Sequence, residues 1–154
     1  MGDIPGVIIL PDANLPGHDL SPMILNFLGK VAILYGKPLQ VQRGTNHSQY
    51  SASGLISDHF AGNAADIYTY ADVYGYDTPM GDHIAENALV AAGMSRADAV
   101  KQSKLGGLWN VYTKDHRIQV IWRTDTGGNH HNHVHIGIRL RKEDEQSSGY
   151  QCLP

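Results

Sequence analysis

The sequence lacks the features of several large classes of protein. It has one cysteine, Cys152, among 154 residues, so no disulfide can form within the chain and a disulfide scaffold is excluded. No apolar run reaches the roughly 20 residues that a membrane-spanning helix needs, so we expect no membrane span. The first residues, MGDIPGVIILPD, show neither the basic region nor the cleavage site of a signal peptide. We therefore expect any export to use other machinery or a larger parent chain.

The sequence also has no large excess of positive or negative charge. The formal net charge is -3, from 12 basic and 15 acidic residues, and no basic stripe is visible. We therefore expect no nucleic-acid partner. A small neutral substrate is compatible with this charge. The length suits a single domain with a core that needs no disulfides.

Histidine, by contrast, is abundant. The chain has nine, and the segment GGNHHNHVHIGI holds a cluster of four, His130, His131, His133 and His135. This cluster runs into an apolar stretch instead of forming a terminal homopolymer, which favours metal binding or catalysis over an affinity tag. The histidines expected simply at the surface are His18, His47, His83 and His116.

Hydrophobic periodicity and chain breakers predict a mixture of helices and strands. Apolar residues recur at helical spacing in three segments, 21–36, 80–92 and 95–104. Strand patterns occupy the segments 6–10, 39–43, 64–68, 117–122 and 133–139, with a further strand around Tyr112. Helices precede and interrupt the strands, and the connections are irregular, so we predict an α+β domain over residues 1–140. The charged and then Ser, Gly and Gln rich segment 141–154 predicts a flexible tail or linker.

The stretch SDHFAGNAADIY, Ser57–Tyr68, places His59 and Asp66 seven residues apart with mostly small residues between them. A catalytic zinc site needs three protein ligands and one open position, and it uses imidazole or carboxylate where thiolate is absent. Gly62 permits unusual backbone angles, and the alanines allow close approach of the backbone. The segment can therefore fold back and bring both side chains to one ion.

The third ligand is expected from the histidine cluster. His131, His133 and His135 alternate along an expected strand, so they should point to one face of it. One of His133 and His135 can bind the ion while the other stands beside the open coordination position.

Two motifs in this chain resemble those of a known family. The first matches SxHxxGxAxD of the zinc D,D-peptidase family, which is related to the amino-terminal signalling domain of Hedgehog proteins, and its residues are Ser57, His59, Gly62, Ala64 and Asp66. His133-Val134-His135 matches the HxH motif near the end of that family's domain. The resemblance covers about 39–139 and implies a Hedgehog/DD-peptidase-like α+β fold, with a central antiparallel sheet, flanking helices and one zinc.

Carried over residue by residue, the resemblance also implies a site. The zinc ligands would be His59, Asp66 and His135, and His133 would be their catalytic neighbour. Arg43, at the end of its expected strand, resembles the basic residue that some members place near the substrate carbonyl or carboxylate.

The activity that the resemblance implies is zinc-dependent hydrolysis of a peptide bond in the stem or cross-link of peptidoglycan, by a D,D-carboxypeptidase or endopeptidase. The wider segment GGNHHNHVHIGI is similar to endolysin-like cell-wall hydrolase domains of phage and actinobacterial proteins. The expected partner is thus a peptidoglycan peptide at the bacterial cell wall. The chain is expected to be a monomer or one domain of a larger protein.

The residue that would transfer a proton differs from the Glu that other branches of the family use. Other branches of the family use a Glu shortly before the last ligand, but this sequence has no acidic residue between Asp125 and the histidine cluster. His133 is therefore the candidate for proton transfer or oxyanion stabilisation.

Several alternatives stay open at this stage. Asp66 can be a buried, hydrogen-bonded carboxylate with no metal, and the whole chain can be a zinc-stabilised binding module without turnover. Ser57 is expected to bond the backbone or a ligand side chain. His130 and His131 are expected to be loop residues or partners of the ligands, and Asp125 is expected either to orient an imidazole or to form a turn.

Overall fold

The computed structural model of the chain describes residues 4–47, 57–69, 78–126, 130–143 and 149–153. Within them the chain forms three helices and seven strands. The helices are α1 (Pro22–Tyr35), α2 (Thr78–Ala92) and α3 (Arg96–Leu105). The strands are β1 (Val7–Ile9), β2 (Leu39–Arg43), β3 (Ala64–Tyr68), β4 (Gly107–Tyr112), β5 (His116–Trp122), β6 (His133–Leu140) and β7 (Gly149–Leu153).

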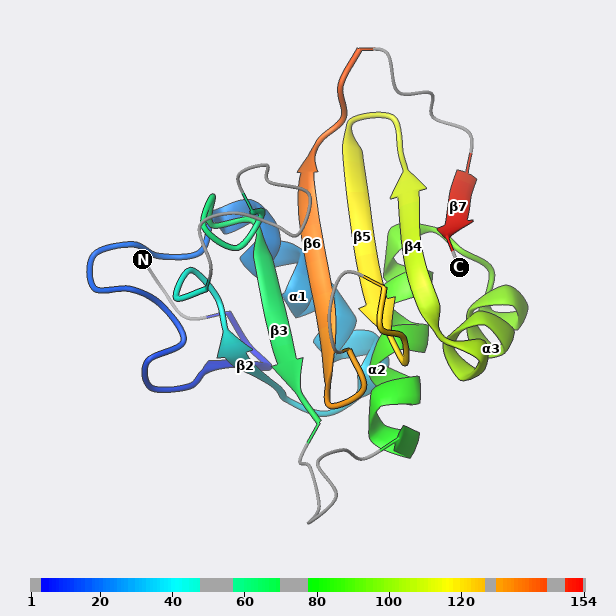
Figure 1. The fold of residues 1–154 in the computed structure, drawn as a ribbon, viewed down its shortest axis with the longest axis horizontal. Coiled ribbons are helices and arrows are strands. Elements are labelled where there is room, and N and C mark those ends of the chain that lie inside the picture. The colour runs from blue at the N-terminus through cyan, green and yellow to red at the C-terminus, as the bar shows by residue number, and fades with distance from the viewer. Residues whose placement is uncertain (1–3, 48–56, 70–77, 127–129, 144–148, 154) are drawn as a thin grey trace.

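All seven strands join one sheet in the order β1-β2-β3-β6-β5-β4-β7. β1 pairs with β2 in parallel, and every other neighbouring pair is antiparallel. The central strands are therefore antiparallel within a mixed sheet, and the predicted α+β class is confirmed (Figure 1).

The sheet extends beyond the boundary predicted at residue 140. β7 pairs with β4 in antiparallel register, from Leu108 opposite Leu153 to Tyr112 opposite Gly149. Strand preference depends strongly on tertiary context, so the composition of the segment 141–154 did not predict that Gly149–Leu153 forms a strand. Residues 144–148 and 154 of the predicted tail lie outside the described residues.

The helix ends follow from their capping residues. Ser21 Oγ accepts a hydrogen bond from the Ile24 amide at the start of α1, and Pro22 occupies the first turn, where no amide donor is needed. Gly36 ends α1 in the left-handed region at φ 82. Ser95 caps α3 in the same way, accepting from the Asp98 amide. The three predicted helices are thus confirmed, with α2 starting at Thr78 instead of residue 80.

One face of the sheet carries the core. Helices α1 and α2 lie behind the sheet in Figure 1, and both contact β6. Along β6 the buried residues Val134, Ile136 and Ile138 belong to the core cluster, as do Trp109 and Trp122 on β4 and β5. Side chains alternate along a strand, so His133 and His135 must point to the opposite face, away from the helices.

Candidate metal centre

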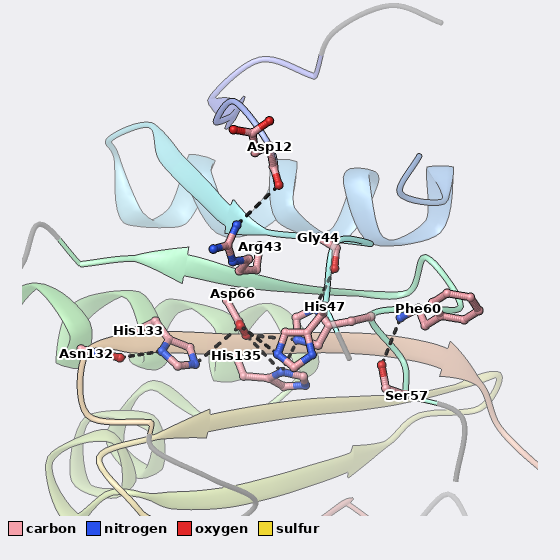
Figure 2. Close-up of polar contacts among 11 residues, drawn as sticks. Asp12, Arg43, Gly44, His47, Ser57, Phe60, Asp66, Asn132, His133 and His135 are labelled. Atoms are coloured by element: carbon pink, nitrogen blue, oxygen red, sulfur yellow. Dashed lines mark hydrogen bonds and ion pairs between the residues drawn. The ribbon is translucent and has the colours of Figure 1, made fainter. Parts of the chain in front are cut away.

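The two motifs meet on the face of the sheet that the helices leave uncovered. Asp66 on β3 lies directly opposite His135 on β6 in the antiparallel register, so their side chains project side by side. His59 lies in the turn that leads into β3. Figure 2 shows the side chains of His47, Asp66, His133 and His135 gathered above this part of the sheet.

Three ligand atoms approach one another closely at this point. Nε2 of His59 lies 3.2 Å from Oδ1 of Asp66 and 3.1 Å from Nδ1 of His135. Nδ1 of His135 lies 3.4 Å from the same oxygen, Oδ1 of Asp66. In a tetrahedral zinc site with bonds of about 2.0–2.1 Å, neighbouring ligand atoms lie about 3.3 Å apart. The three atoms therefore have the mutual spacing of ligands around one ion.

The polar bonding of these side chains also suits a cation. His59, Asp66 and His135 are only 4%, 5% and 7% exposed, so their polar atoms need partners inside the protein. Among the described residues, Oδ1 of Asp66 has no hydrogen bond of acceptable geometry. One proton on Nδ1 of His135 cannot serve both His59 and Asp66, whereas one cation contacts all three atoms. The donor set thus fits a metal ion.

The orientation of His59 is fixed from outside the site. Its Nδ1 lies 3.0 Å from the carbonyl oxygen of Gly44. Since a carbonyl only accepts hydrogen bonds, Nδ1 carries the proton and Nε2 presents its lone pair to Asp66 and His135. A backbone carbonyl that orients a histidine in this way is a usual partner of a metal ligand.

The turn between the first-motif ligands uses its glycine as expected. Gly62 has φ +81, and a Cβ there would lie 3.1 Å from the carbonyl oxygen of Asp19. Its amide donates to the His59 carbonyl at 2.9 Å, and its own carbonyl accepts from the Ser21 amide at 2.7 Å. A side chain at residue 62 would strain this turn, which holds His59 beside the start of β3.

Burial and charge set the protonation of the cluster. Burial alone would raise the pKa of Asp66, but contacts with the rings of His135 and His59 hold that pKa well below its ordinary value of 3.8. Burial lowers the pKa of His135 below its ordinary 6.5, although Asp66 opposes the shift. An ionised carboxylate beside neutral imidazoles is the protonation state that a divalent metal requires.

His133 stands beside these three residues. Its Nδ1 lies 2.7 Å from Oδ1 of Asn132, and its Nε2 lies 3.6 Å from Oδ2 of Asp66. The amide oxygen accepts, so Nδ1 is the donor in this orientation and Nε2 faces the cluster with a lone pair. Burial lowers the pKa of His133. His133 is therefore placed to exchange a proton next to the candidate ligands.

A fourth histidine, His47, joins the group, and the expectation that it lies simply at the surface was incomplete. Its Nε2 is 3.7 Å from Oδ2 of Asp66, and its side chain is 38% exposed. His47, His59 and Asp66 form a group that could hold a metal ion. The His47 ring stacks on that of His59, however, with centroids 4.1 Å apart and planes 5° apart. A coordinated ion lies in the plane of each ring, so two parallel rings at this separation do not share one ion as they stand.

The ring of His135 meets this requirement better. It is inclined at 70° to that of His59, with centroids 4.9 Å apart. Two inclined planes intersect, and an ion can lie on their intersection. We therefore favour His135 over His47 as the third ligand. Nothing in the sequence marked His47, because it lies in an irregular loop with no periodic pattern.

Two further predicted residues, Arg43 and Ser57, lie near the site and bond to the backbone. Arg43 lies opposite Asp66 in the register of β2 and β3, is exposed, and has its Nη1 3.5 Å from the Asp12 carbonyl oxygen (Figure 2). Its contact with substrate stays a prediction. Ser57 Oγ accepts a hydrogen bond from the Phe60 amide at 3.1 Å, so it bonds the backbone, as one alternative expected.

The other cluster histidines divide between the interior and the surface. His130 is buried, and its ring lies 5.0 Å from that of His133 and 5.9 Å from that of His135. His131 does not share their strand face, contrary to expectation, because β6 begins only at His133. Its Nε2 instead lies 3.3 Å from Oδ1 of Asp125, so that carboxylate contacts one imidazole.

In comparisons with known proteins, no family model, no curated protein and no solved structure matches the chain. The resemblance to the zinc D,D-peptidase family therefore rests on the two motifs alone. No helix in the described part of the chain has the length and apolar character needed to cross a membrane.

Proposed function

We propose that this chain is a zinc-dependent peptidase of the bacterial cell wall with a Hedgehog/DD-peptidase-like fold. The observation that carries the proposal is the meeting of His59 Nε2, Asp66 Oδ1 and His135 Nδ1, at separations of 3.1 to 3.4 Å. These atoms belong to the residues that the two motifs mark as ligands. We propose zinc as the metal because two imidazoles and one carboxylate are ligands of catalytic zinc sites, and the three atoms have the spacing of a tetrahedral site.

When bound, zinc supplies Lewis-acid chemistry: it polarises a carbonyl and lowers the pKa of water. The chain's own residues would do the rest. Asp66 stays ionised at neutral pH because its pKa is held low, and it balances the charge of the ion. His133 would take up the proton of the attacking water through Nε2, or donate a hydrogen bond to the developing oxyanion once protonated.

The substrate class follows from the resemblance. We propose a peptide bond of the peptidoglycan stem or cross-link as the scissile bond, cut by carboxypeptidase or endopeptidase action. Arg43 lies opposite Asp66 in the strand register, and we propose that its exposed guanidinium leaves the Asp12 carbonyl to meet a substrate carbonyl or carboxylate.

A second candidate is a zinc-stabilised binding module without turnover. The position of His47 favours it, since a fourth protein ligand would close the coordination sphere, and closed four-ligand sites are structural. The inclined ring of His135 and the stacked ring of His47 favour the open site instead.

Digestion of purified peptidoglycan tests the proposal. Wild-type protein should release new amino groups and shift muropeptide masses, and a chelator should abolish both. Mass spectrometry of the products identifies the bond. His83→Ala is the matched control, because His83 is exposed on α2, away from the candidate ligands. Zinc binding without any product would favour the binding module.

A further inference from the structure

The second ring nitrogen of His135, Nε2, lies on the side of the ring away from the candidate metal centre. Nδ1 faces His59 and Asp66, while Nε2 points away from them. Nε2 is buried and has no hydrogen-bond partner among the described residues. When Nδ1 binds a metal, the single proton of the neutral ring must sit on Nε2. A buried N–H of this kind requires an acceptor.

Gly137 lies beside both this nitrogen and a carboxylate oxygen that can accept. It lies two residues after His135 on β6, on the same face of the strand. A Cβ on Gly137 would lie 3.4 Å from Nε2 of His135 and 3.5 Å from Oδ2 of Asp58. The ring nitrogen and the carboxylate oxygen thus border the same small space, which exists because residue 137 has no side chain.

Asp58 is held in this place by a buried cation. Nη2 of Arg117, on β5, donates a hydrogen bond to Oδ2 of Asp58. The Arg117 side chain is 7% exposed and that of Asp58 is 26% exposed, so the pair is partly shielded from water.

We propose that Asp58 is a positioning residue for the metal site: it accepts the hydrogen bond of the His135 Nε2–H, with Arg117 holding its carboxylate. The contact keeps Nδ1 as the metal-binding nitrogen and fixes the rotation of the ring. This proposal rests on the proposed metal site. A carboxylate behind a metal-bound histidine raises the basicity of the ligand and typically contributes 10- to 100-fold in metal affinity.

The test measures zinc affinity and the Nε2–H signal in the same variants. Zinc dissociation constants are obtained by competition with a chromophoric chelator. Proton NMR of zinc-loaded protein with labelled histidine then follows the exchange of the His135 Nε2–H with solvent. Asp58→Ala should weaken zinc binding by about 10- to 100-fold and speed the exchange of this proton. Asp58→Asn, which keeps an acceptor oxygen, should recover much of the slow exchange.

Gly137→Ala gives an independent test. Its methyl group would sit at ordinary van der Waals distance from both Nε2 and Oδ2, so the fold should tolerate it. It should weaken zinc binding in the same direction, since a methyl group in contact with both polar atoms hinders their approach to each other. If Asp58→Ala does not fold, the double variant Asp58→Ala/Arg117→Met removes both charges together and leaves no unpaired buried cation.

Asp82→Ala is the matched control. Asp82 also accepts from a buried side chain, Trp122 Nε1 at 2.8 Å, but on the core face of the sheet. This variant should lose stability and keep its zinc affinity. Unchanged zinc affinity in Asp58→Ala, or weaker affinity with unchanged Nε2–H exchange, would overturn the positioning role. Wild-type protein that binds no zinc would overturn the metal site itself, while zinc binding without peptidase activity would overturn only the proposed reaction.

Discussion

Asp66 and His135 face each other across the central strand pair, with Oδ1 of one 3.4 Å from Nδ1 of the other. Their positions are set by backbone hydrogen bonds of β3 and β6 instead of by a mobile loop. Paired strands hold these two candidate ligands at a fixed spacing, so little rearrangement of the protein is needed to bind a metal ion.

The first prediction concerns the metal content. Wild-type protein should carry about one zinc per chain, and His59→Ala, Asp66→Ala or His135→Ala should lose it, because each removes one of three ligands. Zinc should also raise the free energy of unfolding of wild type, by about 2.7 kcal/mol at free zinc 100-fold above the dissociation constant. Elemental analysis and thermal melts measure both effects. Folded wild-type protein without zinc at neutral pH would contradict the prediction.

The second prediction separates binding from chemistry at His133. His133→Ala should keep its zinc, because the ring lies beside the ligands with Nε2 nearest Oδ2 of Asp66. Its hydrolysis rate should fall about 100-fold or more if it moves the proton. Zinc analysis and initial rates on peptidoglycan are measured together, with His83→Ala as control. Full activity in His133→Ala would exclude the proposed role.

The third prediction asks whether His47 binds the ion. Its ring is stacked parallel to that of His59, so His47→Ala should retain one metal per chain and leave the visible spectrum of the cobalt-substituted protein almost unchanged. Cobalt spectra respond to coordination number, so they report directly on a lost ligand. A marked change in band intensity would make His47 a ligand and favour the closed, structural site.

The fourth prediction is a pH dependence of stability in the metal-free protein. Burial lowers the pKa values of His133 and His135 from 6.5, and that of Asp66 is held below 3.8, so the unfolded chain binds more protons than the folded chain as pH falls. Their contribution to stability is complete above pH 6.5. It should decline as pH falls below 6.5, where the unfolded histidines become charged, and again below 3.8.

Denaturant unfolding after chelator treatment, at pH values from above 6.5 to below 3.8, measures this dependence. His133→Ala should show a shallower decline just below 6.5 than wild type, because one depressed histidine is gone. A stability that rises as the pH falls through this range would contradict the assigned protonation states.

Local signals in the sequence predicted most of the elements. Ser21 and Gly36 mark the two ends of α1, and the alternating pattern of Leu39–Arg43 marks β2, because capping and side-chain alternation act within a few residues. Strand β4 was less visible: its start at Gly107 lies five residues before Tyr112, where the pattern pointed. β7 offered only a short alternation, with Tyr150 and Cys152 on either side of Gln151, next to a charged and Ser-rich segment.

The site was predictable only in part, for a related reason. His59, Asp66 and His135 stand in motifs whose spacing is fixed along the chain, and the structure brings them together. His47 is brought to the site by the course of its loop, and Asp58 lies near His135 because Gly137 has no side chain. Both positions depend on tertiary packing. Sequence spacing carries no record of such contacts.

The contact between the candidate ligands His59 and His135 joins residues 76 positions apart. This contact forms only after the chain has closed a long loop and β3 has paired with β6. That step is slow, because the chain loses conformational entropy on loop closure before the stabilising contacts form. Zinc would therefore meet its complete ligand set only on the native side of the folding barrier. In kinetic terms the ion should lengthen the lifetime of the folded protein by slowing unfolding, while the rate of refolding stays the same.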